Sequence, residues 1–281
     1  MARKKRQNPL KVCGLIAGHI VLLAGAAVMI VPFLWMLSAS LKPLSEVILI
    51  PPTWIPRQPT LTNYLEVWNE LGFSRYFFNS AFASIAAVVG VLLTSSMAGY
   101  AFTRYRFPGR RAIFLLILAT MMIPSQVLMI PCFILMVHLG WVDTYAGLIA
   151  PSLVSAFGIF MMRQFMQGIP SELIDAARID GCSEPRILWS IVMPLCRPAL
   201  ATLAVFTFLT NWGALLWPLI IANSPQHWTL PVALSKFTEQ YISRTNLQMA
   251  ASTITFVPVL ILFFLAQRQF IEGITLSGLK G

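Results

Sequence analysis

The sequence predicts an all-α polytopic membrane protein with six transmembrane helices. Of its 281 residues, 57% are hydrophobic and 11% are charged, and the mean hydropathy is +0.75. An ordinary soluble domain is about half apolar and about a quarter charged. The apolar residues form long runs rather than the short alternating segments of a β-barrel, so spanning helices are expected.

Six of these runs are long enough to cross a membrane once, which takes roughly 20 residues. They predict a transmembrane domain over residues 13–267, between a basic N-terminus (1–12) and a short tail (268–281). The predicted helices are 13–37, 78–102, 112–134, 146–163, 199–221 and 248–267. Pro32, Pro124, Pro131 and Pro258 fall inside them, and spanning helices tolerate such kinks.

The positive charges predict an orientation. If the N-terminus lies inside and the six helices alternate, inner segments hold fifteen of the 20 Lys and Arg residues. Cytoplasmic loops carry such an excess. Both termini and the long polar loop 164–197 are therefore expected in the cytoplasm. The net charge of +10 then reflects membrane orientation, and we expect no nucleic-acid partner.

Several functions are disfavoured by what the sequence lacks. Apart from Arg163 at the end of the fourth predicted helix, the six ranges hold no Asp, Glu, Lys or Arg, whereas ion-coupled carriers usually keep an ionisable group there. No Gly-Lys pair occurs, so the chain has no nucleotide-binding P-loop of its own. The four cysteines do not have metal-site or disulfide-framework spacing. We expect no catalytic residue and no metal site.

The loop 164–197 is predicted to form two short helices joined by a glycine. Pro170-Ser171 is a helix-start signal, with Ser171 as N-cap and Glu172 in the first turn. Gly181 ends this first helix in the manner of a C′ glycine. The second helix starts near Ser183-Glu184-Pro185 and is expected to stop at Pro194.

One face of the first loop helix is expected to be apolar and small. Leu173, Ala176 and Ala177 share that face at helical spacing, with Asp180 one turn further on. Small side chains let another surface approach closely, and an acid at Asp175 is able to pair with a basic partner.

The loop resembles a known family motif. The spacing Asp175-Ala176-Ala177-x3-Gly181-x9-Ile191-x-Met193-Pro194 is similar to the EAA loop, EAA-x3-G-x9-I-x-L-P, of permease subunits in bacterial ABC importers. Asp175 stands where the pattern has Glu, and Met193 where it has Leu. Looser matches to the maltose-type, carbohydrate-uptake branch are Arg106–Gly109, Gly140–Thr144, Trp212–Leu219 and Gly273–Gly281.

The resemblance implies a permease subunit that moves a sugar or oligosaccharide across the bacterial plasma membrane by alternating access. It implies a second homologous permease, two ATPase subunits that bind ATP and Mg, and an extracytoplasmic solute-binding protein. The sugar and membrane lipid complete the partners, and no cofactor is bound by this chain. The alternatives are the same class of importer for a polyol phosphate, a polyamine or an oxyanion, a non-ABC carrier, or a scaffold.

The resemblance also implies contact residues, because the first helix of the EAA loop docks on the ATPase in that family. The implied ATPase-coupling residues are Glu172, Asp175, Ala176, Ala177, Arg178, Gly181 and Pro194, and Asp175 is expected to meet an Arg of the ATPase. Further contacts are implied for the tail residues Gly278, Leu279, Lys280 and Gly281.

Three residues are candidates for the substrate path. Gln126, Asn211 and Trp212 lie about 12 to 14 residues into their predicted helices, which at about 1.5 Å per residue places them roughly 18–21 Å from the inner end. Amides and an aromatic ring offer hydrogen bonds and stacking to a neutral sugar. The same side chains could instead join helices to one another.

Overall fold

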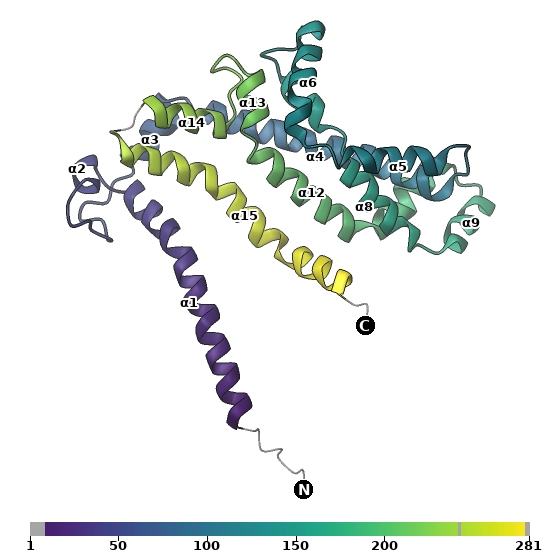
Figure 1. Cartoon of the computed structure of the whole chain (residues 1–281), viewed down its shortest axis with the longest axis horizontal. Coiled ribbons are helices and arrows are strands. Elements are labelled where there is room, and N and C mark those ends of the chain that lie inside the picture. Colours follow the sequence, from purple (N-terminus) through teal and green to yellow (C-terminus); the bar gives the residue numbers. More distant parts are fainter. Residues whose placement is uncertain (1–8, 241–242, 279–281) are drawn as a thin grey trace. The chain divides into compact units, whose positions relative to one another are not determined.

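The computed structural model describes residues 9–240 and 243–278, and all regular structure within these residues is helical (Figure 1). The chain forms two compact units. Met1–Leu71 and Thr238–Ile254 make the first unit, and Gly72–Phe237 and Thr255–Gly281 make the second. Helices α14 (Leu230–Gln240) and α15 (Thr245–Gly278) each contribute residues to both.

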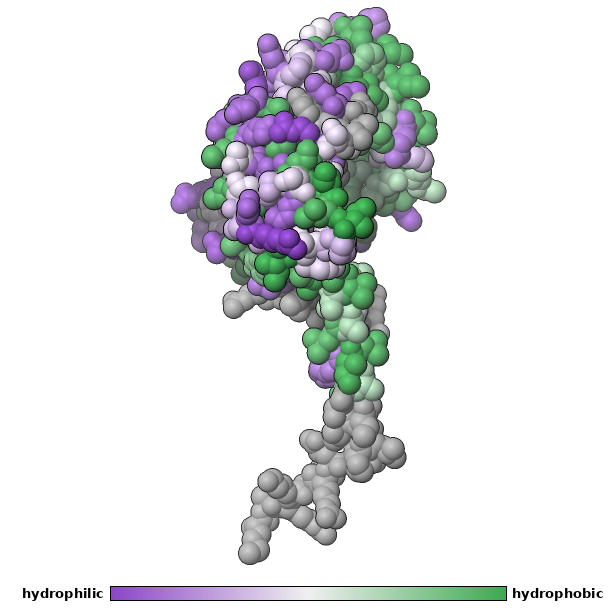
Figure 2. All heavy atoms as spheres, turned by 90° about the vertical axis from the view of Figure 1, so that its left-hand side faces the viewer, coloured by the Kyte–Doolittle hydropathy of each residue, from purple (hydrophilic) through white to green (hydrophobic). Residues whose placement is uncertain are grey.

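The first unit contains the long helix α1 (Pro9–Ser40), the short helices α2 (Leu44–Val47) and α3 (Thr62–Leu65), and a π-helical turn, Glu66–Glu70. Asn63 holds it together. Its amide nitrogen donates to the carbonyls of Ser40 and Lys42, at 2.8 Å each, and its amide oxygen accepts from Asn246 at 2.7 Å. Apolar side chains remain exposed along α1 (Figure 2), and none of the best spanning window in Ala17–Ser40 is buried.

The second unit contains α4 through α13. Their bounds are α4 Phe73–Arg104, α5 Arg110–Thr120, α6 Ser125–Leu139, α7 Tyr145–Ile149, the 3-10 turn Ala150–Ser152, α8 Ala156–Gln167, α9 Ser171–Ile179, α10 Glu184–Ile187, the π-helical turn Leu188–Val192, α11 Met193–Leu195, α12 Arg197–Trp212 and α13 Leu216–Ile221. The long helix α4 packs along both α8 and α12.

Glycines set the close approach of α4 and α8. A Cβ atom on Gly158 would lie 2.3 Å from the Ser95 hydroxyl oxygen, and one on Gly99 would lie 3.0 Å from the Arg163 backbone nitrogen. No side chain fits at these distances. Within a membrane no hydrophobic effect drives helices together. Small residues at such contacts let the helices approach closely enough to pack against one another.

The first residues of α4 also hold a segment distant in sequence. The Asn79 amide nitrogen donates to the carbonyls of Gln226, at 3.0 Å, and Trp228, at 2.8 Å. The Ser80 hydroxyl accepts from the backbone N–H of Leu230 at 2.8 Å. Residues 226–230 are therefore fixed to this end of α4.

Three segments are long and apolar enough to cross a membrane as single helices: Ala17–Ser40, Phe73–Arg104 and Thr245–Gln267. Three bent pairs meet the same criterion together: Arg110–Thr120 with Ser125–Leu139 at 100°, Tyr145–Ser152 with Ala156–Gln167 at 42°, and Glu184–Leu195 with Arg197–Trp212 at 83°. The described chain thus offers three spans, or up to six if each bent pair is counted as one.

Three ranges predicted as single helices are broken. The range 112–134 is interrupted before Pro124, which precedes α6 and has no N–H to continue a helix. The range 146–163 is interrupted at 153–155, where the Ser155 hydroxyl accepts from the Gly158 N–H at 3.1 Å and caps α8. The range 199–221 is interrupted at 213–215, beginning with Gly213. Pro32, Pro131 and Pro258 stand inside helices.

Candidate functional site

The first candidate site is the loop between α8 and α12. Helix α9 begins at Ser171 with Pro170 as its N-cap and no side-chain cap bond, so the expectation that Ser171 is the cap was wrong by one position. Pro170 has an extended backbone conformation, and Ser171 is the first helical residue. Glu172 lies in the first turn as expected, where the helix dipole favours an acid.

The end of α9 is a glycine turn of the Schellman type. Gly181 has φ +77°, a region that other residues rarely adopt. Its N–H donates to the Arg178 carbonyl at 3.0 Å, and the Cys182 N–H donates to the Ala177 carbonyl at 2.9 Å. These two bonds close the helix and turn the chain toward α10.

The structure buries only one of the three α9 residues that were predicted to share an apolar face open to another surface. Ile174, 1% exposed, and Ala177, 6% exposed, pack into the core with Met166 and Ile187. Leu173 and Ala176 are exposed. Both stripes of α9 carry apolar residues at helical spacing, so periodicity alone did not decide between them. Ala177 is thus buried within this chain, whereas Ala176 is exposed.

A carboxylate joins α9 and α10 to α4. The Arg178 Nε donates to Glu184 Oε1 at 2.7 Å, and the Tyr100 hydroxyl, from α4, donates to Glu184 Oε2 at 2.6 Å. Arg178 also pairs with Asp175 at 3.2 Å. The hydrogen bond from Arg178 holds the pKa of Glu184 below its ordinary value, against the opposing effect of burial. Sequence reasoning missed Glu184 and Tyr100, which are 84 residues apart.

The remaining coupling candidates are exposed. The side chain of Asp175 is 61% exposed while paired with Arg178, and Glu172 is exposed beside it. Pro194 is also exposed. The helical run that begins at Glu184 ends at Leu195, one residue beyond Pro194, and the chain bends by 83° there.

The tail candidates lie at the limit of the structure. Gly278 is the last residue of α15. Leu279, Lys280 and Gly281 lie outside the described residues.

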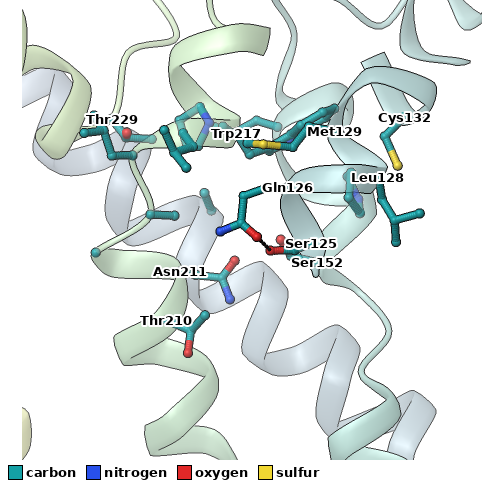
Figure 3. A pocket seen from close by; sticks show the side chains of 18 residues that line it. Ser125, Gln126, Leu128, Met129, Cys132, Ser152, Thr210, Asn211, Trp217 and Thr229 are labelled. Atoms are coloured by element: carbon teal, nitrogen blue, oxygen red, sulfur yellow. Dashed lines mark hydrogen bonds between the residues drawn. The ribbon is translucent and has the colours of Figure 1, made fainter. Parts of the chain in front are cut away.

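The second candidate site is a cavity of about 590 Å³ in the second unit (Figure 3). It lies where the chain leaves helical geometry: Ser125 opens α6, Ser152 ends the 3-10 turn, and 213–215 separates α12 from α13. The lining residues are Ala83, Ser125, Gln126, Leu128, Met129, Cys132, Leu148, Pro151, Ser152, Thr210, Asn211, Gly213, Ala214, Leu215, Leu216, Trp217, Pro218 and Thr229. Broken helices at membrane depth are tolerated where they line a cavity.

Most of the cavity lining is apolar, and none of its lining residues is Asp, Glu, Lys, Arg or His. Its uncharged polar side chains are those of Ser125, Gln126, Ser152, Thr210, Asn211 and Thr229. Figure 3 shows the Gln126 side chain in the middle of the cavity, above Asn211 of α12. The Asn211 amide nitrogen donates to the Thr207 carbonyl at 2.9 Å. The hydroxyl oxygen of Thr229 is buried and has no hydrogen-bond partner within the described residues, so a ligand or water would satisfy it.

Of the three predicted path residues, Gln126 and Asn211 line this cavity and Trp212 does not. Trp212 is 3% exposed. Its indole N–H donates to the Thr255 carbonyl at 3.0 Å, and its ring stacks on Phe208 at 5.3 Å. Trp212 therefore joins α12 to α15 rather than facing the cavity.

Sequence reasoning missed the other polar lining residues, which are Ser125, Ser152, Thr210, Trp217 and Thr229. A signal for three of the helix breaks was present, since Pro124, Pro151 and Gly213 stand beside them. Within the described residues, no three His, Cys, Asp or Glu side chains gather to hold a metal ion.

Comparison with known proteins identifies the class of this membrane protein. Residues 90–275, more than half of the chain, match the family described as "Binding-protein-dependent transport system inner membrane component". The chain belongs to this family. It is a transport component of the inner membrane.

Its relatives narrow the class to permease subunits. The arabinooligosaccharides transport system permease protein AraQ of Halalkalibacterium halodurans is 41% identical, over 91% of this chain and 93% of that protein. AraQ of Bacillus subtilis is 37% identical, over 89% and 90%. The sn-glycerol-3-phosphate transport system permease protein UgpE of Brucella abortus is 32% identical, over 92% and 95%. Because its relatives are permease proteins, this chain is a transport subunit and not an enzyme.

Solved structures share the fold. A chain of a bacterial ABC transporter involved in the import of the acidic polysaccharide alginate is 25% identical, with a TM-score of 0.83 over 95% of this chain and 99% of that one. A bacterial alginate ABC transporter in complex with an alginate pentasaccharide-bound periplasmic protein is 12% identical, with a TM-score of 0.64 over 94% and 98%. The second likeness shows the fold alone.

Proposed function

We propose that this chain is the permease subunit of an ATP-driven importer for a neutral sugar or oligosaccharide. The observation that carries the proposal is the cavity at the helix breaks. Its amides and hydroxyls suit the hydroxyl groups of a sugar. Its lining offers no charge to an anion such as a polyol phosphate, whose burial without a partner is costly. The names of the AraQ relatives support an oligosaccharide as the cargo.

We further propose six membrane spans, one in each of the six ranges predicted from the sequence, with both termini and the loop 164–197 in the cytoplasm. The uneven distribution of Lys and Arg supports this orientation. It puts α9 on the cytoplasmic side and the cavity within the membrane. Non-helical backbone around the cavity fits such a depth.

In this proposal, the exposed face of α9 docks on an ATPase subunit. Glu172, Leu173, Asp175 and Ala176 form that face, with Ile179 87% exposed at its end. ATP and Mg bind to two ATPase subunits, not to this chain. A second permease completes the membrane part, and an extracytoplasmic solute-binding protein delivers the cargo. Closure of the ATPase dimer then moves the spans between two access states.

The test is transport by the assembled importer in proteoliposomes, with arabino-oligosaccharides as cargo. Gln126→Ala and Asn211→Ala each remove a hydrogen-bonding group from the cavity. We expect about a fivefold loss of transport efficiency in each variant, as for one neutral hydrogen bond of about 1 kcal/mol. ATP hydrolysis without cargo should stay unchanged. Gln164→Ala, an exposed amide of α8 outside the cavity, is the matched control. Unchanged transport in both cavity variants would rule out this path.

A further inference from the structure

A second, smaller cavity of about 250 Å³ lies at the junction of α4, α5 and α8, within the second unit. Its six lining residues are Phe102 of α4, Arg110, Arg111, Phe114 and Leu115 of α5, and Arg163 of α8. Half of the lining is cationic and half is apolar. The larger cavity around Gln126 and Asn211, called the sugar cavity below, shares none of these residues.

The three arginines lack a negative counter-charge. Arg110 donates to the Tyr105 carbonyl at 2.9 Å, and the Arg163 guanidinium lies 4.1 Å from the centre of the Phe114 ring. In the described part of the chain, no carboxylate lies within ion-pair distance of Arg110, Arg111 or Arg163. Like charges around one cavity repel, and a bound anion would offset that repulsion.

The start of α5 adds to the positive potential. Arg110 and Arg111 are its first two residues, after Gly109, and its first turn holds no acid. The N-terminal end of a helix carries a partial positive charge and free N–H groups. Cations are unfavourable there and anions are favourable. The helix end and the arginine side chains therefore both favour an anionic ligand.

The apolar half of the cavity indicates that the ligand also has an apolar part. Phe102 and Phe114 are buried walls, and the surface of α5 continues outward through Ile113, 45% exposed, and Leu116, 68% exposed. A ligand with a negative head and apolar chains fits both halves. Basic pockets between membrane helices at the cytoplasmic side take lipid headgroups.

We propose that this cavity binds the headgroup phosphate of an anionic phospholipid, with its acyl chains along the exposed side of α5. The assignment to the inner leaflet rests on the orientation proposed above, whereas the binding itself does not. Arg111 and Arg163 hold the phosphate, and Phe114 orients Arg163 by stacking.

The experiment measures retention of phosphatidylglycerol by native mass spectrometry. The importer is purified in the assembly that it forms in its membrane and exchanged into nanodiscs that contain phosphatidylcholine with a minor share of phosphatidylglycerol. We expect the parent protein to retain phosphatidylglycerol, and Arg163→Gln and Arg111→Gln each to weaken its binding about tenfold, as for the loss of a hydrogen bond to a charged group. Arg111 is exposed, so its variant tests binding without disturbing a packed side chain.

Arg106→Gln is the matched control, because Arg106 is an exposed cation of the same turn outside the cavity lining. It should change phosphatidylglycerol retention less than twofold. Equal retention by all variants, or equal loss in the control, would overturn the proposal. Displacement of the lipid by inorganic phosphate at the same concentration would assign the cavity to a soluble anion instead. Transport assays on the same samples separate this result from the proposed cargo.

Discussion

Among single residues, Glu184 has the most consequential contacts outside the cavity. Its carboxylate accepts from Arg178 of α9 and from Tyr100 of α4 at 2.7 and 2.6 Å. Gly181 makes the turn between α9 and α10 possible, but a turn does not by itself transmit force. The carboxylate ties the loop to α4, so we expect motion imposed on α9 to reach α4 instead of being absorbed at Gly181.

Replacing Glu184 should therefore uncouple transport from ATP hydrolysis. We expect Glu184→Gln to lower the number of cargo molecules moved per ATP severalfold, while the assembly still forms. Glu184→Gln should lower the free energy of unfolding by only about 1 kcal/mol, because the ion pair with Arg178 is partly exposed. Tyr100→Phe removes the second contact and should act in the same direction. The ratio of uptake to phosphate release in proteoliposomes measures the effect.

Glu70→Gln, an exposed acid of the first unit, serves as the control. A pH series adds an independent check. Because the folded protein lowers the pKa of Glu184 from 4.5, the ionised form stabilises the loop above that value and is lost as pH falls through the lower folded pKa. The parent protein should lose more thermal stability than Glu184→Gln across this acidic window. Parallel losses would contradict the role of the charge.

The single-residue predictions succeeded where local chemistry decides. Gly181 takes the left-handed conformation that its place after a helix predicts, with φ +77°. The inward face of α9 could not be predicted, because Leu173 and Ile174 are equally apolar and only the neighbouring helices select between them. Trp212 was misjudged for a similar reason, because the direction of its side chain depends on its hydrogen bond to α15.

At the scale of elements, the contact of α4 with α8 depends on glycines. Gly99→Ala places a methyl group 2.9 Å from the Met162 Cβ and 3.0 Å from a backbone nitrogen. Since backbone cannot yield cheaply, we expect a loss of about 1–3 kcal/mol, the usual cost of overpacking. The melting temperature of the purified assembly should fall by several degrees.

Gly25→Ala provides the comparison, because nothing lies within 4 Å of a Cβ added there. A glycine in a helix interior is also less favourable than alanine. The control should keep or slightly raise the melting temperature. If Gly99→Ala were as stable as Gly25→Ala, the close packing of α4 on α8 would be disproved.

The elements that could be predicted are the ones whose apolar runs are uninterrupted. Hydropathy averaged along a run finds α1, α4 and α15, but it does not register the breaks at 121–124, 153–155 and 213–215. These breaks depend on backbone hydrogen bonds, which Pro124 and the Ser155 cap redirect. Because the cavity lies beside these breaks, most of its lining residues were not predicted either.

At the scale of the whole molecule, the chain leaves much apolar surface uncovered. The best spanning windows of Phe73–Arg104 and Thr245–Gln267 are only 28% and 22% buried, and that of Ala17–Ser40 is 0% buried. Lipid covers part of such a surface. The exposed face of α9 also carries the apolar side chains of Leu173 and Ile179, which are 48% and 87% exposed, and we expect a protein partner to cover them.

We therefore expect this chain to co-purify, after mild extraction, with a second multi-span permease and with an ATPase in twofold molar excess. Mass spectrometry of the intact assembly measures the ratio. Asp175→Arg should deplete the ATPase while retaining the second permease, because it reverses a charge on the exposed face of α9. Recovery of the chain alone from a well-preserved membrane would contradict the importer assembly.

The two attachments of α4 have a mechanical consequence. One end of this helix is tied through Tyr100 to the loop, and the other is tied through Asn79 and Ser80 to residues 226–230, which include Thr229 of the sugar cavity. Ser80 and Tyr100 are 20 residues apart, which is about 30 Å along a helix at about 1.5 Å per residue. A tilt of about 10° about one attachment then displaces the other by about 5 Å, from the same helix length. If the loop is the point of coupling proposed above, we expect the length of α4 to convert a small rotation at the loop into a displacement of several ångströms at residues 226–230.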